Sequence, residues 1–159
     1  MSSTTQEHRA DAPKTVRCAV VPVSDTRTLD TDTGGREIVD ALTQAGHQVV
    51  VREIIPDDPE RIRQLLSSAH VRESADAVLL TGGTGITRRD TTYETVTGML
   101  TRQLPGYGEL FRMLSYAQIG PAAMLSRTVG GLIGGQVVLT MPGSPAAVRL
   151  AMHEIILPE

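Results

Sequence analysis

The sequence predicts an α/β fold, a three-layer sandwich in which a mostly parallel sheet lies between two layers of helices. Short runs rich in valine, isoleucine and leucine alternate with segments in which apolar residues recur every three or four positions. Turns rich in glycine, serine and proline separate these segments. Strands that alternate with helices form parallel sheets that are covered on both faces.

The first half of the chain contains three predicted strands. The apolar runs at Val16–Val23, His47–Ile55 and Ala75–Leu80 have the length and composition of buried parallel strands. Between the first two runs, Thr33–Ala45 carries apolar side chains at helical spacing and is followed by Gly46, a typical helix stop. We therefore expect a strand–helix–strand unit at the start of the fold.

Two pairs of residues mark the starts of further helices. Asp58 precedes Pro59 and Ser144 precedes Pro145, and each pair combines an N-cap side chain with proline at the first helical position. The predicted apolar stripes of these two helices are Ile62, Leu65, Leu66 and Ala69 in the first, and Val148, Ala151, Met152 and Ile155 in the second.

The middle of the chain is less regular. Thr91 and Glu94 have the spacing of a capping box, which predicts a helix that begins there. Gly106–Ala117 is predicted to be a helix, and strands are predicted at Ala122–Val129 and Gln136–Met141. The predicted helix carries Leu110, Phe111 and Leu114, and the turns around the last two strands are assigned to Gly130-Gly131 and Gly134-Gly135.

Length and composition limit the class of protein. The 159 residues predict a single domain, residues 15–159, after a polar tail, residues 1–14, that we expect to be disordered and not a signal peptide. A net charge of −3 without a basic run argues against nucleic acid as a partner, and no apolar run reaches the ~20 residues of a membrane span. The single cysteine, Cys18, excludes a disulfide within the chain, so a cytoplasmic location is predicted.

The glycine-rich segment after the third predicted strand is the strongest functional signal. Glycines allow the backbone to approach a ligand closely, and the N–H groups of such a turn and of the following helix start attract anions. Two arginines and an aspartate follow, so the segment predicts a phosphate site beside a metal-binding acid. A tight turn without a ligand, with solvated arginines and an acid that only complements the helix dipole, is the alternative. The candidate residues are Thr81, Gly82, Gly83, Thr84, Gly85, Arg88, Arg89 and Asp90.

Two other loops are expected at the same edge of the sheet. Asp57 follows the second predicted strand, and Pro142, Gly143 and Ser144 follow the last one. The carboxyl ends of parallel strands meet at one edge, where ligands bind. Since Asp58 is the better helix cap, Asp57 is free to form an Mg²⁺ site with the acid of the glycine segment.

Two other kinds of site are excluded. A P-loop needs a lysine after its glycines, whereas Ile86 and Thr87 follow Gly85, and the only lysine is Lys14 in the tail. The four histidines lack the spacing of zinc ligands to one another or to the cysteine. The site therefore has to depend on backbone groups, carboxylates and arginines.

Several of these motifs resemble the MogA/MoaB family of molybdenum cofactor biosynthesis. The resemblance implies an α/β molybdopterin-binding fold, a trimer or hexamer, and adenylylation of molybdopterin by Mg-ATP with release of pyrophosphate, before transfer to a molybdate-insertion protein. It also implies that Asp57 and Asp90 are the catalytic and magnesium-binding acids. The matching motifs are Val23-Ser24-Asp25, Thr81–Gly85 with Arg89-Asp90, Pro105–Glu109, Ser126-Arg127 and Met141-Pro142-Gly143. The further residues expected to bind substrate or nucleotide are Ser24, Asp25, Ser115, Ser126, Arg127, Pro142, Gly143 and Ser144.

Alternatives to this function and to single roles stay open at this stage. A molybdopterin-binding protein of the MoaB branch without catalysis is one, because Tyr107–Ser115 resembles that branch, although the retained Arg-Arg-Asp sequence favours an enzyme. A nucleotide hydrolase similar to the CinA N-terminal domain is another. Arg127 could form a structural or intersubunit salt bridge instead of contacting a ligand. The apolar residues Phe111, Met113 and Leu114 are assigned to the core or to a subunit interface.

Overall fold

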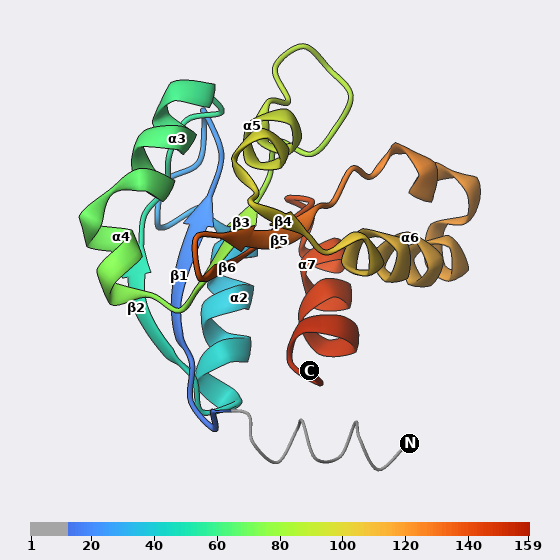
Figure 1. The fold of residues 1–159 in the computed structure, drawn as a ribbon. Helices are drawn as coiled ribbons and strands as arrows, with labels where there is room; N and C mark the ends of the chain where they lie inside the picture. Colours follow the sequence, from blue (N-terminus) through green and yellow to red (C-terminus); the bar gives the residue numbers. More distant parts are fainter. Residues whose placement is uncertain (1–12) are drawn as a thin grey trace.

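A six-stranded sheet forms the centre of the protein (Figure 1) in the computed structural model, which describes residues 13–159. The strand order is β2-β1-β3-β6-β5-β4; the first four strands are parallel, and β5 and β4 are antiparallel to their neighbours. The predicted mostly parallel sheet is thus confirmed. The strands are β1 (Arg17–Pro22), β2 (Gln48–Arg52), β3 (Ala77–Thr81), β4 (Arg102–Gln103), β5 (Gly130–Ile133) and β6 (Gln136–Met141).

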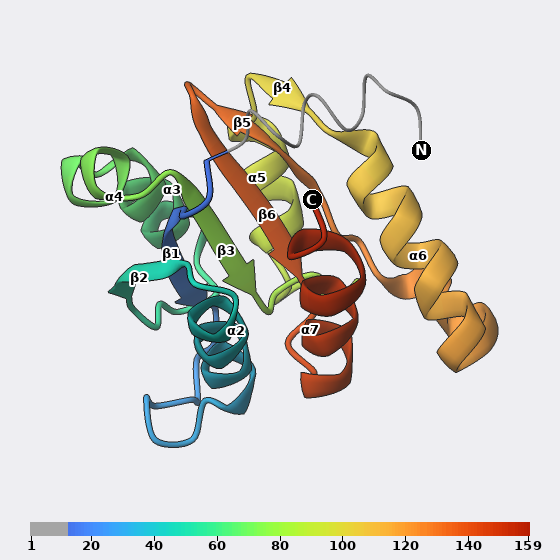
Figure 2. The same cartoon turned by 90° about the horizontal axis from the view of Figure 1, so that it is seen from below.

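Helices cover both faces of the sheet, which confirms the three-layer arrangement. Figure 2 shows α3, α4 and α5 on one side and α2, α6 and α7 on the other. The 3₁₀-helix η1 follows α6, and a π-helical turn, η2, extends α7. The helices are α2 (Thr33–Gln44), α3 (Pro59–Ser67), α4 (Ala69–Ser74), α5 (Thr92–Met99), α6 (Pro105–Ile119), η1 (Gly120–Leu125), α7 (Pro145–Ala151) and η2 (Met152–Ile156).

The two helix layers explain why β1 is apolar at successive positions. Cys18 and Val20 pack toward α2, α6 and α7, whereas Ala19 and Val21 pack toward α3, α4 and α5. All four residues are buried, because successive side chains of a strand point to opposite faces and both faces are covered here. The sheet therefore has an apolar core on each face, and the polar loops lie at the ends of its strands.

The burial of Cys18 leads to a chemical prediction. Only 3% of Cys18 is exposed, and this burial raises the pKa of its thiol to about 11. Since the thiolate is the reactive form, we expect no reaction with a disulfide reagent such as Ellman's reagent at pH 8 until the protein is unfolded. Complete labelling of the folded protein within minutes would contradict the assignment of this residue to the core.

The predicted helix after Pro59 is interrupted at Ser68. The Ser68 hydroxyl donates to the carbonyl of Leu65 at 2.7 Å and accepts from the N–H of Val71 at 3.3 Å, so it ends α3 and begins α4. Consequently Val71 is buried, and Ala69, predicted to be in the apolar stripe, is exposed. The predicted N-cap Asp58 is confirmed, since its carboxylate accepts from the N–H of Arg61 at 2.9 Å.

The segment between α6 and β6 differs from the prediction. The predicted strand Ala122–Val129 is wrong, because Pro121 opens η1 and the residues after it do not pair as a strand. The predicted turn at Gly130 and Gly131 is strand β5, which runs against β6. A Cβ on Gly130 would lie 3.0 Å from the Tyr107 ring, so the glycine is needed for packing.

Part of the predicted tail lies outside the described residues. This holds for residues 1–12; Pro13 and Lys14, the two remaining residues, are exposed and belong to neither a helix nor a strand. Along residues 13–159, none of the helices combines the length and the apolar character that crossing a membrane requires.

Candidate functional site

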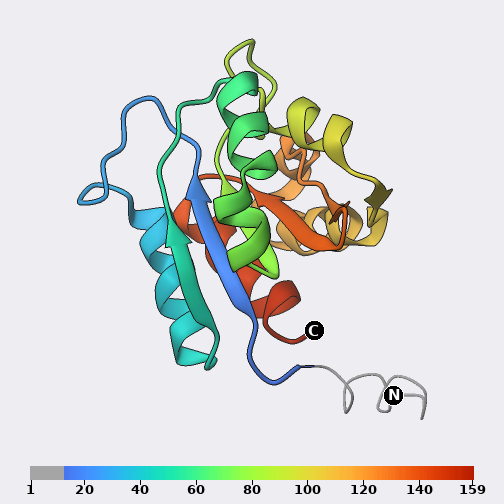
Figure 3. The same ribbon diagram turned by 60° about the vertical axis from the view of Figure 1, so that its left-hand side comes forward.

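The loops that follow the parallel strands meet at one edge of the sheet, as the sequence predicts. The N–H of Gly82 after β3 donates to the Met141 carbonyl of β6 at 3.0 Å. The Thr81 hydroxyl donates to the Pro142 carbonyl at 3.1 Å, and the N–H of Val23 donates to the Thr81 carbonyl at 2.8 Å. The loop after β1 and the segment after β2 lie along the same edge (Figure 3).

The glycine segment has a backbone that only glycine accommodates. Gly82 and Gly83 have φ values of 109° and 65°. A Cβ on Gly82 would lie 2.3 Å from the Val23 carbonyl oxygen, so a side chain is excluded by conformation and by contact. The turn is therefore fixed against the loop that follows β1.

Two glycines of the turn leave room for the two predicted acids. A Cβ on Gly83 would lie 2.6 Å from Oδ2 of Asp57, and a Cβ on Gly85 would lie 2.7 Å from Oδ2 of Asp90. The carboxylates thus pack directly against the bare backbone of the turn. The two acids that the sequence placed on separate loops thus lie against the same glycine turn.

Asp57 is held by the start of α5. Its Oδ1 accepts from the N–H of Thr91 at 3.1 Å and from the Thr91 hydroxyl at 2.6 Å, while the N–H of Asp57 donates to Asp25 at 3.1 Å. The predicted capping box is wrong, because Thr91 makes no side-chain cap bond and Glu94 pairs with Arg127 instead. The second oxygen of Asp57 has no hydrogen-bond partner within residues 13–159, so it is available to a ligand.

Asp90 is held by its own turn. Its Oδ2 accepts from the N–H of Thr87 at 2.9 Å and from the Thr87 hydroxyl at 2.6 Å. These hydrogen bonds are the main cause that lowers the pKa of the Asp90 carboxyl, while partial burial opposes the shift. Asp90 is consequently ionised at neutral pH, as a metal-binding acid must be.

Arg127 holds the glycine turn and the residues after it through hydrogen bonds to their carbonyl groups. Its guanidinium donates to the carbonyls of Thr84 at 3.4 Å and Asp90 at 3.5 Å, and also to that of Gly85. The same group pairs with Glu94 and lies over a tyrosine ring with 5.1 Å to the ring centroid. Each guanidinium nitrogen therefore has a protein partner, which favours the structural salt bridge over the predicted ligand contact.

Loss of Arg127 should loosen this loop. We expect Arg127→Leu to lower the free energy of unfolding by about 2 kcal/mol, because partly buried carbonyls lose their donor. Urea denaturation measures this change, and hydrogen exchange should show faster exchange at residues 84–90. Arg149→Leu is the control, because the exposed pair of Arg149 with Glu37 should contribute less than about 1 kcal/mol. Equal effects of the two substitutions would contradict the loop-supporting role.

An open cleft of about 400 Å³ lies between the glycine turn, α6, η1 and the start of α7. The Ser144 hydroxyl caps α7 by accepting from the N–H of Ala147 at 3.2 Å and keeps its own proton for donation. Ser126 contributes a buried hydroxyl without a hydrogen-bond partner within residues 13–159, as expected of a group that awaits a ligand. The sequence-predicted residues that line the cleft are Gly82, Gly83, Thr84, Gly85, Asp90, Ser115, Ser126, Pro142, Gly143 and Ser144.

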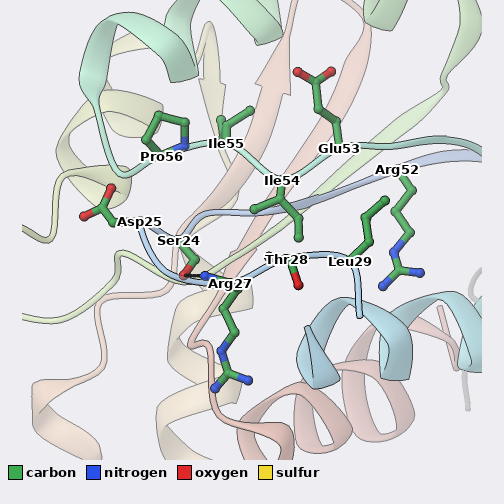
Figure 4. Close-up of a pocket in the computed structure, with 10 residues that line it drawn as sticks. All are labelled: Ser24, Asp25, Arg27, Thr28, Leu29, Arg52, Glu53, Ile54, Ile55 and Pro56. Carbon is green, nitrogen blue, oxygen red and sulfur yellow. Dashed lines mark hydrogen bonds between the residues drawn. The ribbon is translucent and has the colours of Figure 1, made fainter. Parts of the chain in front are cut away.

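The remaining predicted residues lie outside this cleft. Ser24 and Asp25 line a separate groove of about 490 Å³ between the loop after β1 and the segment Arg52–Pro56 (Figure 4). Arg89 forms an ion pair with Asp25, and Arg88 lines a third cavity, between α3 and α5. Thr81 lines a further hollow of about 170 Å³ together with Ser24, Gly82 and Gly143. The predicted site residues are thus divided over several hollows along the same sheet edge.

Several residues of the site carry no signal in the sequence. The apolar side of the cleft comes from α6, η1 and α7, where a single apolar residue cannot be told from a core residue. Thr92 is fully buried, and its hydroxyl has no hydrogen-bond partner among the described residues although it abuts Gly83. The missed cleft residues are Ile119, Leu125 and Ala147, and Phe111, assigned to the core or an interface, lines the cleft from the core.

Comparison with known proteins identifies the family. A family model described as a probable molybdopterin binding domain matches residues 19–159. The chain belongs to the MogA/MoaB family. Molybdenum cofactor biosynthesis protein B of Bacillus cereus is 53% identical over 154 residues, which cover 96% of this chain and 91% of that protein. Belonging to this family places the chain in molybdenum cofactor biosynthesis.

Solved structures of MogA/MoaB proteins have the same architecture. A crystal structure of molybdenum cofactor biosynthesis protein B matches with a TM-score of 0.89 and 53% identity, covering 94% of this chain and 93% of the other. The tungsten cofactor synthesizing protein MoaB from Pyrococcus furiosus matches with a TM-score of 0.81 and 36% identity, covering 91% and 92%. The predicted MogA/MoaB-like fold is confirmed.

The acids fit a magnesium ion only if it arrives with a nucleotide. Within residues 13–159, no group of three or more histidine, cysteine, aspartate or glutamate side chains is placed to hold a metal. Asp57 and Asp90 would supply at most two protein ligands. Mg²⁺ commonly completes its octahedral shell with waters and substrate phosphates, so two carboxylates beside a phosphate-binding turn match this chemistry.

Proposed function

We propose that the protein transfers an adenylyl group from Mg-ATP to the terminal phosphate of molybdopterin and releases pyrophosphate. The main support is the position of Asp57 and Asp90, two carboxylates that pack against one glycine turn beside an open cleft. The family membership supplies the pterin as substrate. A plain turn without a ligand would not require acids to be fixed on both sides of it.

The chain's own groups position and neutralise phosphates. The N–H of Gly83, which has no hydrogen-bond partner within residues 13–159, is the donor for the nucleotide, and the hydroxyls of Ser126 and Ser144 are the donors for the pterin phosphate. The pterin phosphate oxygen attacks the α-phosphorus, and the bond from that phosphorus to the β-phosphate oxygen breaks. No protein nucleophile is needed, because phosphoryl-type transfer is catalysed by aligning the two substrates and by stabilising the charge of the transition state. Mg²⁺, held by the two acids, would offset the charge on the phosphates.

A direct assay tests this proposal. Purified protein is incubated with Mg-ATP alone and with Mg-ATP plus molybdopterin, and pyrophosphate and adenylylated pterin are measured. The proposal requires both products, and requires the pterin for either to form. Hydrolysis of ATP without pterin would identify the CinA-like alternative, whereas pterin binding without product would identify a non-catalytic member of the MoaB branch.

The outer face of α6 supports an oligomer. Met113 and Tyr116 are each 60% exposed, and Leu110, Ile119 and Met124 are also exposed on α6 and η1. Of the residues assigned to the core or to a subunit interface, Phe111 is 1% exposed and Leu114 is half-buried against the core, whereas Met113 lies on this outer face. We expect a trimer, or a hexamer built from trimers, in light scattering at micromolar protein. A monomer under these conditions would contradict the expected oligomer, but not the proposed transfer reaction.

A further inference from the structure

A second cavity, of about 340 Å³, lies beside the segment that follows the glycine turn, residues 87–91. It is bounded by the first turns of α3 and α5, where Pro59 and Thr91 belong to its wall. Asp90 lines both this cavity and the cleft, so the two hollows adjoin at that residue. The sequence assigns Arg88 and Asp90 to a phosphate site, but no motif assigns a ligand to Arg63 or to the space between α3 and α5.

Two arginines give this cavity a positive character. Arg88 makes no hydrogen bond or ion pair within residues 13–159, and the side chain of Arg63 only approaches Glu60 at 4.0 Å. Glu94, the one other acid on the wall besides Asp90, is neutralised by its pair with Arg127. Both guanidinium groups are therefore available to an anion.

We propose that this cavity holds the β- and γ-phosphates of the nucleotide, with Arg63 and Arg88 as their ligands. This inference rests on the proposed adenylyl transfer. In a displacement at phosphorus the attacking and leaving oxygens lie roughly in line on opposite sides. If the pterin phosphate attacks from the cleft, the β-phosphate oxygen departs with the bonding electron pair on the far side of Asp90, where the cavity lies.

The surrounding backbone matches the same ligand. The N-terminal ends of α3 and α5 carry the positive poles of their helix dipoles, and both face this space. Arg63 carries no motif, since it is an exposed residue in the middle of α3. Its role follows from the packing of α3 beside α5 and not from its place in the sequence.

Nucleotide titrations distinguish direct phosphate binding by Arg63 from a non-specific effect of the protein's net charge. The full chain is titrated by calorimetry with Mg-ATP, with AMP and with inorganic pyrophosphate, and the variants Arg63→Ala and Arg63→Lys are compared with it. We expect Arg63→Ala to weaken Mg-ATP and pyrophosphate binding about tenfold and to leave AMP binding unchanged. Arg63→Lys should restore part of the loss, because an ammonium keeps the charge without the two-pronged contact.

Arg61→Ala is the matched control. Arg61 lies on the same helix, is exposed and contacts only Gln64 through its side chain, so its loss changes the net charge equally without entering the cavity. Equal weakening by the two alanine variants, unchanged Mg-ATP binding in Arg63→Ala, or equal loss of AMP and ATP would each overturn the inference. If the unaltered protein binds pyrophosphate through Arg63 but does not bind ATP, the proposed transfer fails while the anion site stands.

Discussion

Replacing Gly85 with alanine should abolish most adenylyl transfer, by about a hundredfold or more, although no catalytic side chain is removed. The three atoms nearest to the added Cβ all belong to the Asp90 carboxylate and would lie at 2.7, 3.0 and 3.2 Å. Gly85 has an ordinary negative φ, so the backbone tolerates alanine. The carboxylate has to move from its place beside the turn, which removes charge stabilisation from the reacting phosphates.

The measurement is the rate of adenylylated pterin formation, with thermal denaturation beside it. Gly98→Ala is the control, because a Cβ there meets nothing within 4 Å in α5 and should stabilise the helix by about 0.5–1 kcal/mol. Gly83→Val is less informative: a Cβ at Gly83 would lie 2.1 Å from the Thr92 hydroxyl, and its φ is positive. A Gly85→Ala protein with full activity would show that the position of Asp90 does not matter for catalysis.

Asp57→Asn should reduce transfer by about a hundredfold or more, while molybdopterin binding and the fold are kept. The side-chain oxygen of asparagine can still accept from the N–H and hydroxyl of Thr91, so the start of α5 stays in place. The substitution removes the negative charge and replaces the free second oxygen by an NH₂ group, which cannot bind Mg²⁺. We therefore expect a lower turnover at saturating pterin and not a weaker pterin affinity.

The neighbouring acid provides the control for this substitution. Asp58→Asn retains an N-cap for α3 and should leave both transfer and stability nearly unchanged, since asparagine caps helices about as well as aspartate. Magnesium titrations distinguish the two variants, because only Asp57→Asn should require more metal for half-maximal activity. If both variants have normal turnover, the magnesium site lies elsewhere.

Local signals in the sequence were sufficient for much of the fold. Asp58 and Ser144 cap their helices as predicted, because each accepts from a backbone N–H only three residues away. The alternation of buried strands and amphipathic helices likewise depends on neighbours in the chain, and it places the glycine turn at the correct edge of the sheet. Local signals were not always sufficient, since the break of the helix at Ser68 and the 3₁₀-helix around Pro121 were missed.

Predictions failed where a distant partner determined the outcome. The Thr91 hydroxyl donates to Asp57, 34 positions away, and makes no cap bond in its own helix. Gly130 belongs to a strand because it pairs with Leu139 of β6, and no local pattern contains that information. For the same reason the apolar residues of the cleft were missed, whereas the acids beside the turn were found from their chemical type.

The division of the cleft between two parts of the chain has a consequence for protein engineering. The acids are held by Thr87 and Thr91, near neighbours of the glycine turn, whereas α6 and η1 form the facing wall as one continuous segment, residues 105–125. The reactive chemistry and the pocket's shape are thus encoded separately. Replacing residues 105–125 by the same segment of a relative should change which pterin derivative binds, while the glycine turn and the two acids stay unchanged.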